Sequence, residues 1–346
     1  MRARMRGCLA GAFVAGVLFV LVMIVLKADW TSQVGKYAEK SPDPQPPASA
    51  QPSTSPQPSD SASPKPSQSS SGSSEVEVLD ENRLDARRLE LTLRSPALDA
   101  ITKVRLLLPR NWDEQERWPA LWLLHGGLDD HTSWTAKTDV DALTRDDALM
   151  VVMPDGGRCG SYSDWWNGGA GGPPRWATYH LKELLPLLES RYRAGPSRAI
   201  AGYSMGGQGA MLYAAKGGFK AAASFSGAVH ILADGVPQAV MAGTTLGCVG
   251  TDWKRIWGDP DRERANWRAH NPYDQAENLR GVRLYVAAGG GDLVEDLAAR
   301  AARAFTGRLR DLDIPVTTHF YRGGHHHTFW QRELRRAYPM LKGALR

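Results

Sequence analysis

The chain has 346 residues, of which 42% are hydrophobic and 23% are charged, a balance typical of a globular protein. Its formal net charge of +5 is modest, and part of it belongs to the N-terminus. There is no basic run with interleaved aromatic residues. A nucleic-acid partner is therefore not expected.

The first 30 residues are predicted to be a signal anchor. A basic start, residues 1–6, precedes an unbroken apolar run at 7–26, which is long enough as a helix to cross a hydrocarbon core of about 30 Å. No clear small-residue cleavage site follows the run, so we favour an uncleaved transmembrane helix over a cleaved signal peptide or a buried soluble helix. The arginines before the run favour a cytoplasmic N-terminus. We expect a membrane-anchored protein with its globular part outside the cytoplasm, or a secreted protein if the anchor is cut.

Residues 31–82 are predicted to be a disordered stalk. Most of this segment, from 41 to 74, consists almost entirely of Pro, Ser, Ala, Gln and Asp. Such a composition cannot bury enough apolar surface to offset the loss of chain entropy on folding. The remaining residues, 83–346, are long enough for a single α/β domain.

The hydrophobic pattern of that domain indicates a mostly parallel sheet. Alternation predicts a half-exposed strand at 87–93, and a second strand is expected at 101–108. Continuous apolar runs are typical of strands buried on both faces, and they fall at 119–124, 148–153, 199–201, 221–225 and 282–287. A further strand is expected at 316–321, and a helical pattern at 179–192 contains Pro186, which should kink or interrupt it. The alternation of strands and helices predicts an α/β fold, a doubly wound sheet with helices on both faces.

Residues 202–206, Gly-Tyr-Ser-Met-Gly, have the pattern of a nucleophile elbow, which places a serine on a tight turn between a strand and a helix. Glycines flank Ser204 where side chains would clash. The turn presents the hydroxyl at a helix N-terminus, where the dipole favours developing negative charge. The pattern alone is weak evidence, because a nucleophilic serine also needs a base and an orienting acid.

Residues 325–327 are three adjacent histidines near the end of the chain, where the base is expected if the order is serine, acid, histidine. We select His325, because it directly follows a Gly-Gly turn after the strand expected at 316–321. His326 is the alternative base, and a polar loop cluster is the alternative to catalysis. A metal site is not expected, because no Cys or carboxylate lies at ligand spacing.

The orienting acid is expected on the loop after the strand at 282–287. Asp292, Glu295 and Asp296 are the candidates. One of them is predicted to hold the imidazole, and the others are interpreted as charges that a helix N-terminus favours.

Two backbone N–H groups are needed to bind an oxyanion. Met205, directly after the serine, is expected to supply one of them. The loop at 125–130, His-Gly-Gly-Leu-Asp-Asp, is expected to supply the other, since its glycines let the backbone approach a substrate oxygen. His125 itself is interpreted as structural.

Cys159 and Cys248 both lie in Gly-rich loops. They are candidates for a disulfide in an oxidising exterior, with unpaired buried thiols as the alternative.

Several motifs together resemble the esterase D superfamily of α/β-hydrolases, and within it the mycolyltransferase group of cell-envelope acyltransferases and their secreted esterase relatives. The resemblance covers nearly all of the domain, and it rests on residues 153–157, 162–165, 202–206, 257–260, 267, 271–272, 324–325, 330 and 339. It implies the α/β-hydrolase fold, acyl-serine chemistry without a metal or other cofactor, and Gly127 as the second oxyanion donor.

The resemblance also favours particular members of the candidate triad. The spacing to Trp330 supports His325 over His326. The mycolyltransferase pattern places a glutamate ten residues before a helical phenylalanine, and Glu295 has this relation to Phe305. Glu295 is therefore preferred over Asp292 and Asp296.

Two departures from the mycolyltransferase pattern affect the predicted substrate. Mycolyltransferases carry an arginine in the oxyanion loop that helps hold trehalose, and loop 125–130 has none. They also carry a tryptophan two residues after the histidine, where this chain has His327. Trp165, with Trp166 and Trp176, is a candidate to line an acyl or sugar cleft, and core packing is the equal alternative.

These observations predict an extracytoplasmic serine esterase that acts on a small-molecule, lipid or sugar ester, with Ser204 as nucleophile, His325 as base and Glu295 as acid. Acyl transfer to an envelope sugar or lipid is the alternative. A non-catalytic envelope-binding module is a third interpretation, and it would be favoured by a missing triad residue.

Overall fold

The computed structural model describes residues 75–113 and 115–346, and these residues form one compact unit. The predicted anchor at 1–30 and most of the predicted stalk lie outside the described residues. Within the described segments, no helix is both long and apolar enough to cross a bilayer.

A nine-stranded sheet organises this unit, with the strand order β1-β2-β3-β5-β4-β6-β7-β8-β9. The three pairs that involve β1, β2 and β3 are antiparallel, and the remaining neighbours run parallel. The strands are β1 (Glu77–Arg83), β2 (Arg88–Ser95), β3 (Ala100–Leu107), β4 (Trp118–Leu124), β5 (Met150–Pro154), β6 (Ala194–Tyr203), β7 (Ala221–Phe225), β8 (Arg283–Ala288) and β9 (Val316–Phe320). The predicted mostly parallel α/β sheet is thus confirmed.

Both faces of the parallel part are buried, which explains its continuous apolar runs. In β8, Leu284 and Val286 pack into the core on one face, while Tyr285 and Ala287 pack into the core on the other. Successive side chains of a strand point to opposite faces, so a strand covered on both sides has no polar positions. In β2 the buried positions instead alternate with less buried ones, as predicted for a half-exposed strand.

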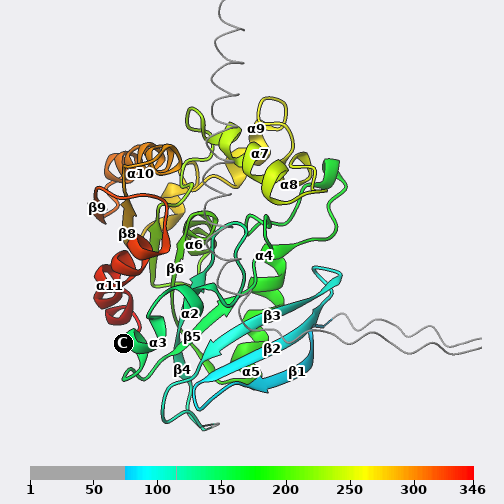
Figure 1. The fold of residues 1–346 in the computed structure, drawn as a ribbon, viewed down its shortest axis with the longest axis vertical. Helices are drawn as coiled ribbons and strands as arrows, with labels where there is room; N and C mark the ends of the chain where they lie inside the picture. Colours follow the sequence, from blue (N-terminus) through cyan, green and yellow to red (C-terminus); the bar gives the residue numbers. More distant parts are fainter. Residues whose placement is uncertain (1–74, 114) are drawn as a thin grey trace, which may run out of the picture. The chain divides into compact units, whose positions relative to one another are not determined.

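Helices cover both faces of the sheet (Figure 1). The first core contains residues of α5 (Leu185–Arg191), α6 (Met205–Ala215) and α10 (Leu293–Asp311). The second contains residues of α11 (His327–Gly343) and of the short helices α2 (Ser133–Lys137) and α3 (Val140–Thr144).

The helical pattern predicted at 179–192 is distorted but not interrupted, because the chain stays helical from Trp176 to Arg191. It begins with α4 (Trp176–Thr178), continues as a π-helical segment η2 (Tyr179–Leu184), and becomes α-helical again in α5, where Pro186 lies in the first turn. The π-helical segment lies just before Pro186, where a regular α-helix would need the N–H that proline lacks.

The long connection from β7 to β8 carries α7 (Val236–Gly247), α8 (Lys254–Trp257), α9 (Arg264–Ala269) and the 3-10 turn η3 (Ala276–Leu279). In Figure 1, α7, α8 and α9 lie together at one end of the molecule. A separate cluster of buried aromatic and aliphatic side chains stabilises this region: Trp165, Ile231, Ile256, Trp257 and Trp267.

The predicted boundary between stalk and domain at residue 83 is wrong. The sheet already begins at Glu77, because β1 pairs antiparallel with β2 from Glu77 to Arg83. Val76 and Val78 pack against the core, although the side chains of this edge strand are mostly exposed. A strand that is largely solvated has little hydrophobic signal, and its place is set by the hydrogen bonds of its neighbour.

Candidate active site

Ser204 occupies a strained turn between β6 and α6. Its φ of 54° and ψ of −123° lie outside the regions that residues with side chains ordinarily adopt. A Cβ on Gly202 would overlap the backbone of Gly206, and a Cβ on Gly206 would overlap the carbonyl oxygens of β4 and the following loop. The glycines of the motif are therefore required by close backbone packing, and the strain is located at the serine.

The structure brings Ser204, His325 and Glu295 together in one hydrogen-bonded chain. His325 Nε2 lies 2.9 Å from Ser204 Oγ, and His325 Nδ1 lies 2.7 Å from Glu295 Oε2. Glu295 is completely buried, whereas the His325 side chain is 19% exposed. Because the carboxylate can only accept from Nδ1–H, the other ring nitrogen is left to accept the serine proton.

The buried Glu295 carboxylate has partners for both oxygens. Oε1 accepts from Ser226 Oγ at 2.6 Å and from the Gly289 N–H, while Oε2 faces the imidazole. Ser226 also accepts from the indole N–H of Trp330. Such partners are needed because an unpaired buried carboxylate is costly. Sequence reasoning missed Ser226, which follows β7 and carries no motif.

The other two acids have different positions. Asp292 is the N-cap of α10, where its Oδ1 accepts from the Glu295 N–H at 2.8 Å. Its Oδ2 accepts from the His325 N–H at 2.8 Å, so Asp292 also fixes the histidine backbone. Asp296 is exposed in the first turn of the same helix. Both match the predicted helix N-terminal charges.

His326 is occupied elsewhere. It is the exposed N-cap of α11, and its Nδ1 accepts from the Thr328 N–H at 3.2 Å. The arrangement therefore favours His325 as the partner of the serine.

The two expected oxyanion donors belong to different elements, the start of α6 and the loop after β4. Met205 is the first residue of α6, where an N–H has no acceptor within the helix. Gly127 is exposed, and across the described part of the chain its N–H donates no hydrogen bond. The next N–H, that of Leu128, is already bound to the Arg158 carbonyl at 2.7 Å. The Gly127 N–H is therefore free to donate, and its role as the second oxyanion donor stays a prediction.

His125 supports the same loop, in line with its structural interpretation. It is buried, its Nδ1 donates to the Gly126 carbonyl at 2.7 Å, and its Nε2 accepts from the Gly156 N–H at 2.8 Å. Another buried histidine, His180, donates from Nε2 to the carbonyl of Asp155, in the loop after β5, at 2.9 Å. The His125 ring thus connects loop 125–130 to the loop after β5, and the His180 ring holds the loop after β5 by a second hydrogen bond.

Asp129, in loop 125–130, contacts His327 at the start of α11. Sequence reasoning missed this contact. Asp129 Oδ2 accepts from Tyr203 at 2.6 Å and lies 3.1 Å from His327 Nε2, and its Oδ1 accepts from Lys137 at 2.6 Å. Burial acts to raise the pKa of Asp129, but the hydrogen bond from His327 and the Lys137 charge outweigh it and hold that pKa well below its usual range. Burial also lowers the pKa of His327, against the raising effect of Asp129.

Trp165 is mostly buried, at 8% exposure, and its indole N–H donates to the Gly160 carbonyl. The Arg255 guanidinium lies over the ring at 5.1 Å. Packing accounts for these contacts, and a role in binding substrate stays a prediction.

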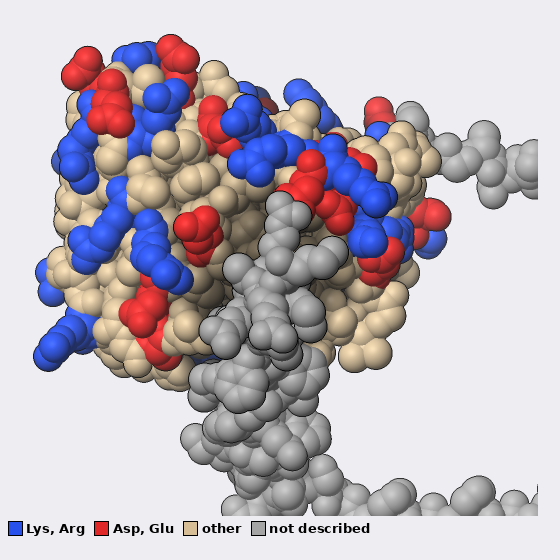
Figure 2. All heavy atoms as spheres, turned by 90° about the horizontal axis from the view of Figure 1, so that it is seen from above, with Lys and Arg blue, Asp and Glu red and all other residues tan. Residues whose placement is uncertain are grey.

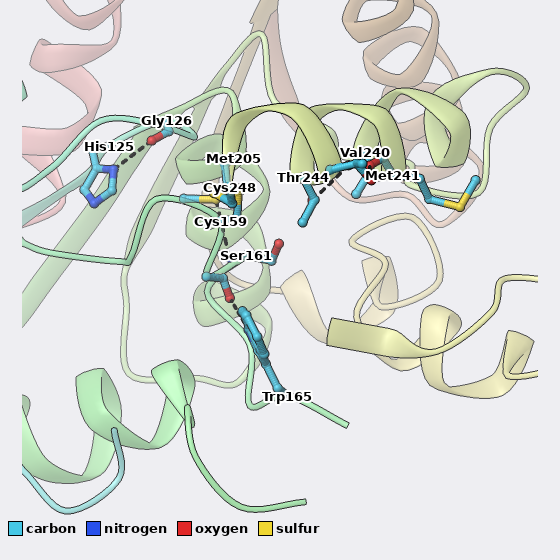
Figure 3. Close-up of a disulfide and its surroundings, with 12 residues drawn as sticks. His125, Gly126, Cys159, Ser161, Trp165, Met205, Val240, Met241, Thr244 and Cys248 are labelled. Carbon is cyan, nitrogen blue, oxygen red and sulfur yellow. Dashed lines mark hydrogen bonds between the residues drawn. A yellow bond between two sulfur atoms is a disulfide. The ribbon is translucent and has the colours of Figure 1, made fainter. Parts of the chain in front are cut away.

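Cys159 and Cys248 form a disulfide, with their Cα atoms 6.3 Å apart (Figure 3). Within residues 75–113 and 115–346, no group of three or more His, Cys, Asp or Glu side chains is placed to hold a metal ion. On the face shown in Figure 2, acidic and basic side chains are intermixed.

The sheet, its helices and the serine turn define the class of this protein as an α/β-hydrolase. Solved structures agree with this fold. An S-formylglutathione hydrolase from Agrobacterium tumefaciens matches with a TM-score of 0.65 at 21% identity, over 78% of this chain and 99% of that chain. MPT51 of Mycobacterium tuberculosis matches with a TM-score of 0.61 at 24% identity, over 73% of this chain and 96% of that chain.

Residues 95–341 match the model of a family described as putative esterase, and the chain belongs to this family. Esterase Rv1288 of Mycobacterium tuberculosis (strain ATCC 25618 / H37Rv) is 32% identical over 265 residues, which cover 72% of this chain and 58% of the relative. The chain therefore spans little more than half of that relative. A diacylglycerol acyltransferase/mycolyltransferase, Ag85B of Mycolicibacterium smegmatis, is 29% identical over 65% of this chain and 77% of its own length. Membership supports ester hydrolysis or acyl transfer as the chemistry.

Proposed function

We propose that this protein is a serine esterase that hydrolyses acyl esters through an acyl-serine intermediate. Ser204 Oγ attacks the ester carbonyl while His325 Nε2 takes its proton. Glu295 holds the imidazole in the required tautomer and stabilises the imidazolium that forms. The Gly127 and Met205 N–H groups bind the developing oxyanion. His325 then protonates the leaving alcohol, and water, activated by the same base, releases the acid.

The chain of contacts from Ser204 Oγ through the imidazole to Glu295 carries this proposal. A serine hydroxyl is a weak nucleophile at neutral pH unless an oriented base accepts its proton. The partial exposure of Ser204 and His325 leaves the reacting atoms open to a substrate, while the acid is sealed from water.

Replacement of the nucleophile tests the proposal. We expect Ser204→Ala to lower kcat for p-nitrophenyl butyrate by on the order of 10⁴-fold or more, because the covalent route is lost. Ser163→Ala, which changes a buried serine outside the triad, is a comparison for general effects on folding. Equal rates for wild type and Ser204→Ala would contradict an esterase.

Acyl transfer is the second candidate, and it is favoured by the similarity to Ag85B. Hydrolysis is preferred because loop 125–130 has no arginine to hold a sugar, and Asp129 in that loop is already engaged with Lys137. Incubation with an acyl ester and trehalose or another sugar distinguishes the two. Acylated sugar in excess of free acid would favour transfer.

We also propose an extracytoplasmic location for the catalytic domain. The Cys159–Cys248 disulfide supports this location, since disulfides persist mainly in oxidising compartments. The apolar run at 7–26 supports a membrane anchor. Fractionation of cells, followed by protease treatment of intact cells, tests both parts: a domain protected from protease in the cytoplasmic fraction would contradict them.

A further inference from the structure

One short loop, residues 158–161, contacts a neighbour of Gly127 and the side chain of Met205, the two expected oxyanion donors. Figure 3 shows Cys159 and Ser161 of this loop near Met205. The Arg158 carbonyl accepts from the Leu128 N–H at 2.7 Å, directly after Gly127. The Ser161 N–H points to the sulfur of Met205 at 3.4 Å. Cys159 lies between these two contacts, so its position affects the neighbours of both expected donors.

The partner cysteine lies at the end of α7, next to a residue that contacts Leu128. Cys248 caps the helix, and its neighbour Gly247 packs directly against the Leu128 side chain. A Cβ on Gly247 would lie only 2.5 Å from Leu128 Cδ2. Leu128 is therefore held at its backbone by the residue before Cys159 and at its side chain by the residue before Cys248.

Apolar packing does little to hold this end of α7. The buried residues of the helix are Val236, at its start, and Thr244. Beyond Cys248, Val249 is 91% exposed. The disulfide is thus the strong attachment of this helix end to loop 158–161.

We propose that the Cys159–Cys248 disulfide is a positioning element of the oxyanion hole. It clamps Leu128 between loop 158–161 and α7, and in this way keeps the Gly127 N–H aimed at the substrate oxygen. The inference rests on the proposed esterase function. Ser204, His325 and Glu295 are held by contacts on other elements, so breaking the disulfide affects the oxyanion side and leaves the hydrogen-bonded chain in place.

Reduction followed by reoxidation tests the proposal. A dithiol such as dithiothreitol passes two electrons and two protons to the cysteines, so the S–S bond becomes two thiols and the dithiol becomes a cyclic disulfide. All proteins carry Cys8→Ser, which confines thiol chemistry to this pair. We expect reduction to lower kcat for p-nitrophenyl butyrate by about 10-fold or more, short of the 10²–10³-fold cost of deleting an oxyanion donor, with KM changed less than about 2-fold. Reoxidation restores kcat, and a Cys159→Ser/Cys248→Ser variant has the lower kcat with or without reductant.

A destabilised control separates positioning from general loosening. Leu188→Ala opens a cavity in the core at α5, away from the candidate site. Assays are made at a temperature where circular dichroism shows every protein folded. An unchanged kcat after reduction, or an equal loss of kcat in Leu188→Ala, overturns the proposal. Equal rates for oxidised wild type and Ser204→Ala would instead overturn the esterase function on which it rests.

Discussion

The acid–base side and the oxyanion side of the candidate site are held in place by different means. Glu295 and His325 lie beside the N-termini of long helices, and the cap residue Asp292 fixes the backbone of both. Gly127 lies in a loop whose position depends on contacts with remote segments, through Leu128 and Asp129. Both sides use contacts between distant segments, but Glu295 and His325 are anchored at helix N-termini that share the hydrogen bonds of Asp292, whereas Gly127 lies in a loop held only through its neighbours. Changes in remote loops should act on the second side much more than on the first.

Among the variants that compare the two sides, replacement of the acid Glu295 is expected to lower kcat most. Glu295→Gln retains the shape of the side chain but removes the charge and replaces one of its two acceptor oxygens with an NH₂ donor. With the amide oxygen accepting from Ser226 and Gly289, this NH₂ group faces His325 Nδ1 and favours the wrong imidazole tautomer. We expect kcat to fall by about 10³–10⁴-fold, with the fold unchanged by circular dichroism. Asp296→Asn, at the exposed neighbouring position, is the matched control and should leave kcat within about 2-fold. A small loss in Glu295→Gln together with a large one in Asp292→Asn would reassign the acid.

The buried histidine His180, which contacts the loop after β5, should make the free energy of unfolding depend on pH. Burial lowers the pKa of His180 to about 4, so the folded protein holds the ring neutral. In the unfolded chain the pKa is about 6.5. The unfolded state therefore binds more protons between these values: the contribution is fully present above pH 6.5 and is lost as the pH falls towards 4. The difference between these two pKa values corresponds to about 3 kcal/mol.

Urea unfolding at several pH values between 4.5 and 7 measures this slope. We expect His180→Gln to be less stable at pH 7, because its contacts with Asp155 and Tyr213 change, but to lose less stability on acidification than wild type. His326→Gln, at an exposed helix cap, should keep the slope of wild type. If His180→Gln retained the full slope, the buried neutral histidine would not be its source.

Replacement of Asp129, which connects loop 125–130 to His327, is expected to lower kcat less than replacement of Glu295 does. Asp129→Asn removes the charge that binds Lys137 and His327 while keeping the size of the side chain. We expect kcat to fall about 10-fold, equivalent to about 1.4 kcal/mol of barrier, with KM changed little, because the oxyanion loop is less firmly placed. Asp130→Asn, in the adjacent exposed position, is the control. Equal kcat values in the two variants would mean that the link does not position the loop.

The sequence indicates the features that rest on local patterns. Continuous apolar runs located the parallel strands, and the glycine-flanked serine located the turn after β6. His325 and Glu295 came from motif spacing combined with the family resemblance, and the structure places both beside Ser204. Their catalytic roles stay predictions until they are measured.

The features missed by sequence reasoning are contacts between distant segments. Nothing in the spacing of Asp129 and His327 indicates that they are in contact. Their contact depends on the fold, which brings both residues next to Tyr203. Nothing in the sequence distinguishes Ser226 from the other serines. Its position directly after β7 brings it into contact with Glu295. The edge strand β1 escaped notice because most of its side chains face solvent, and its backbone pairing leaves little trace in composition.

Covalent labelling tests the central claim, that Ser204 is an activated nucleophile, most directly. The protein is incubated with a fluorophosphonate, digested, and the modified residue is identified by mass spectrometry. The account predicts a single adduct at Ser204, absent in Ser204→Ala and formed far more slowly in Glu295→Gln. An adduct on another residue, or none in the oxidised wild type, would contradict it.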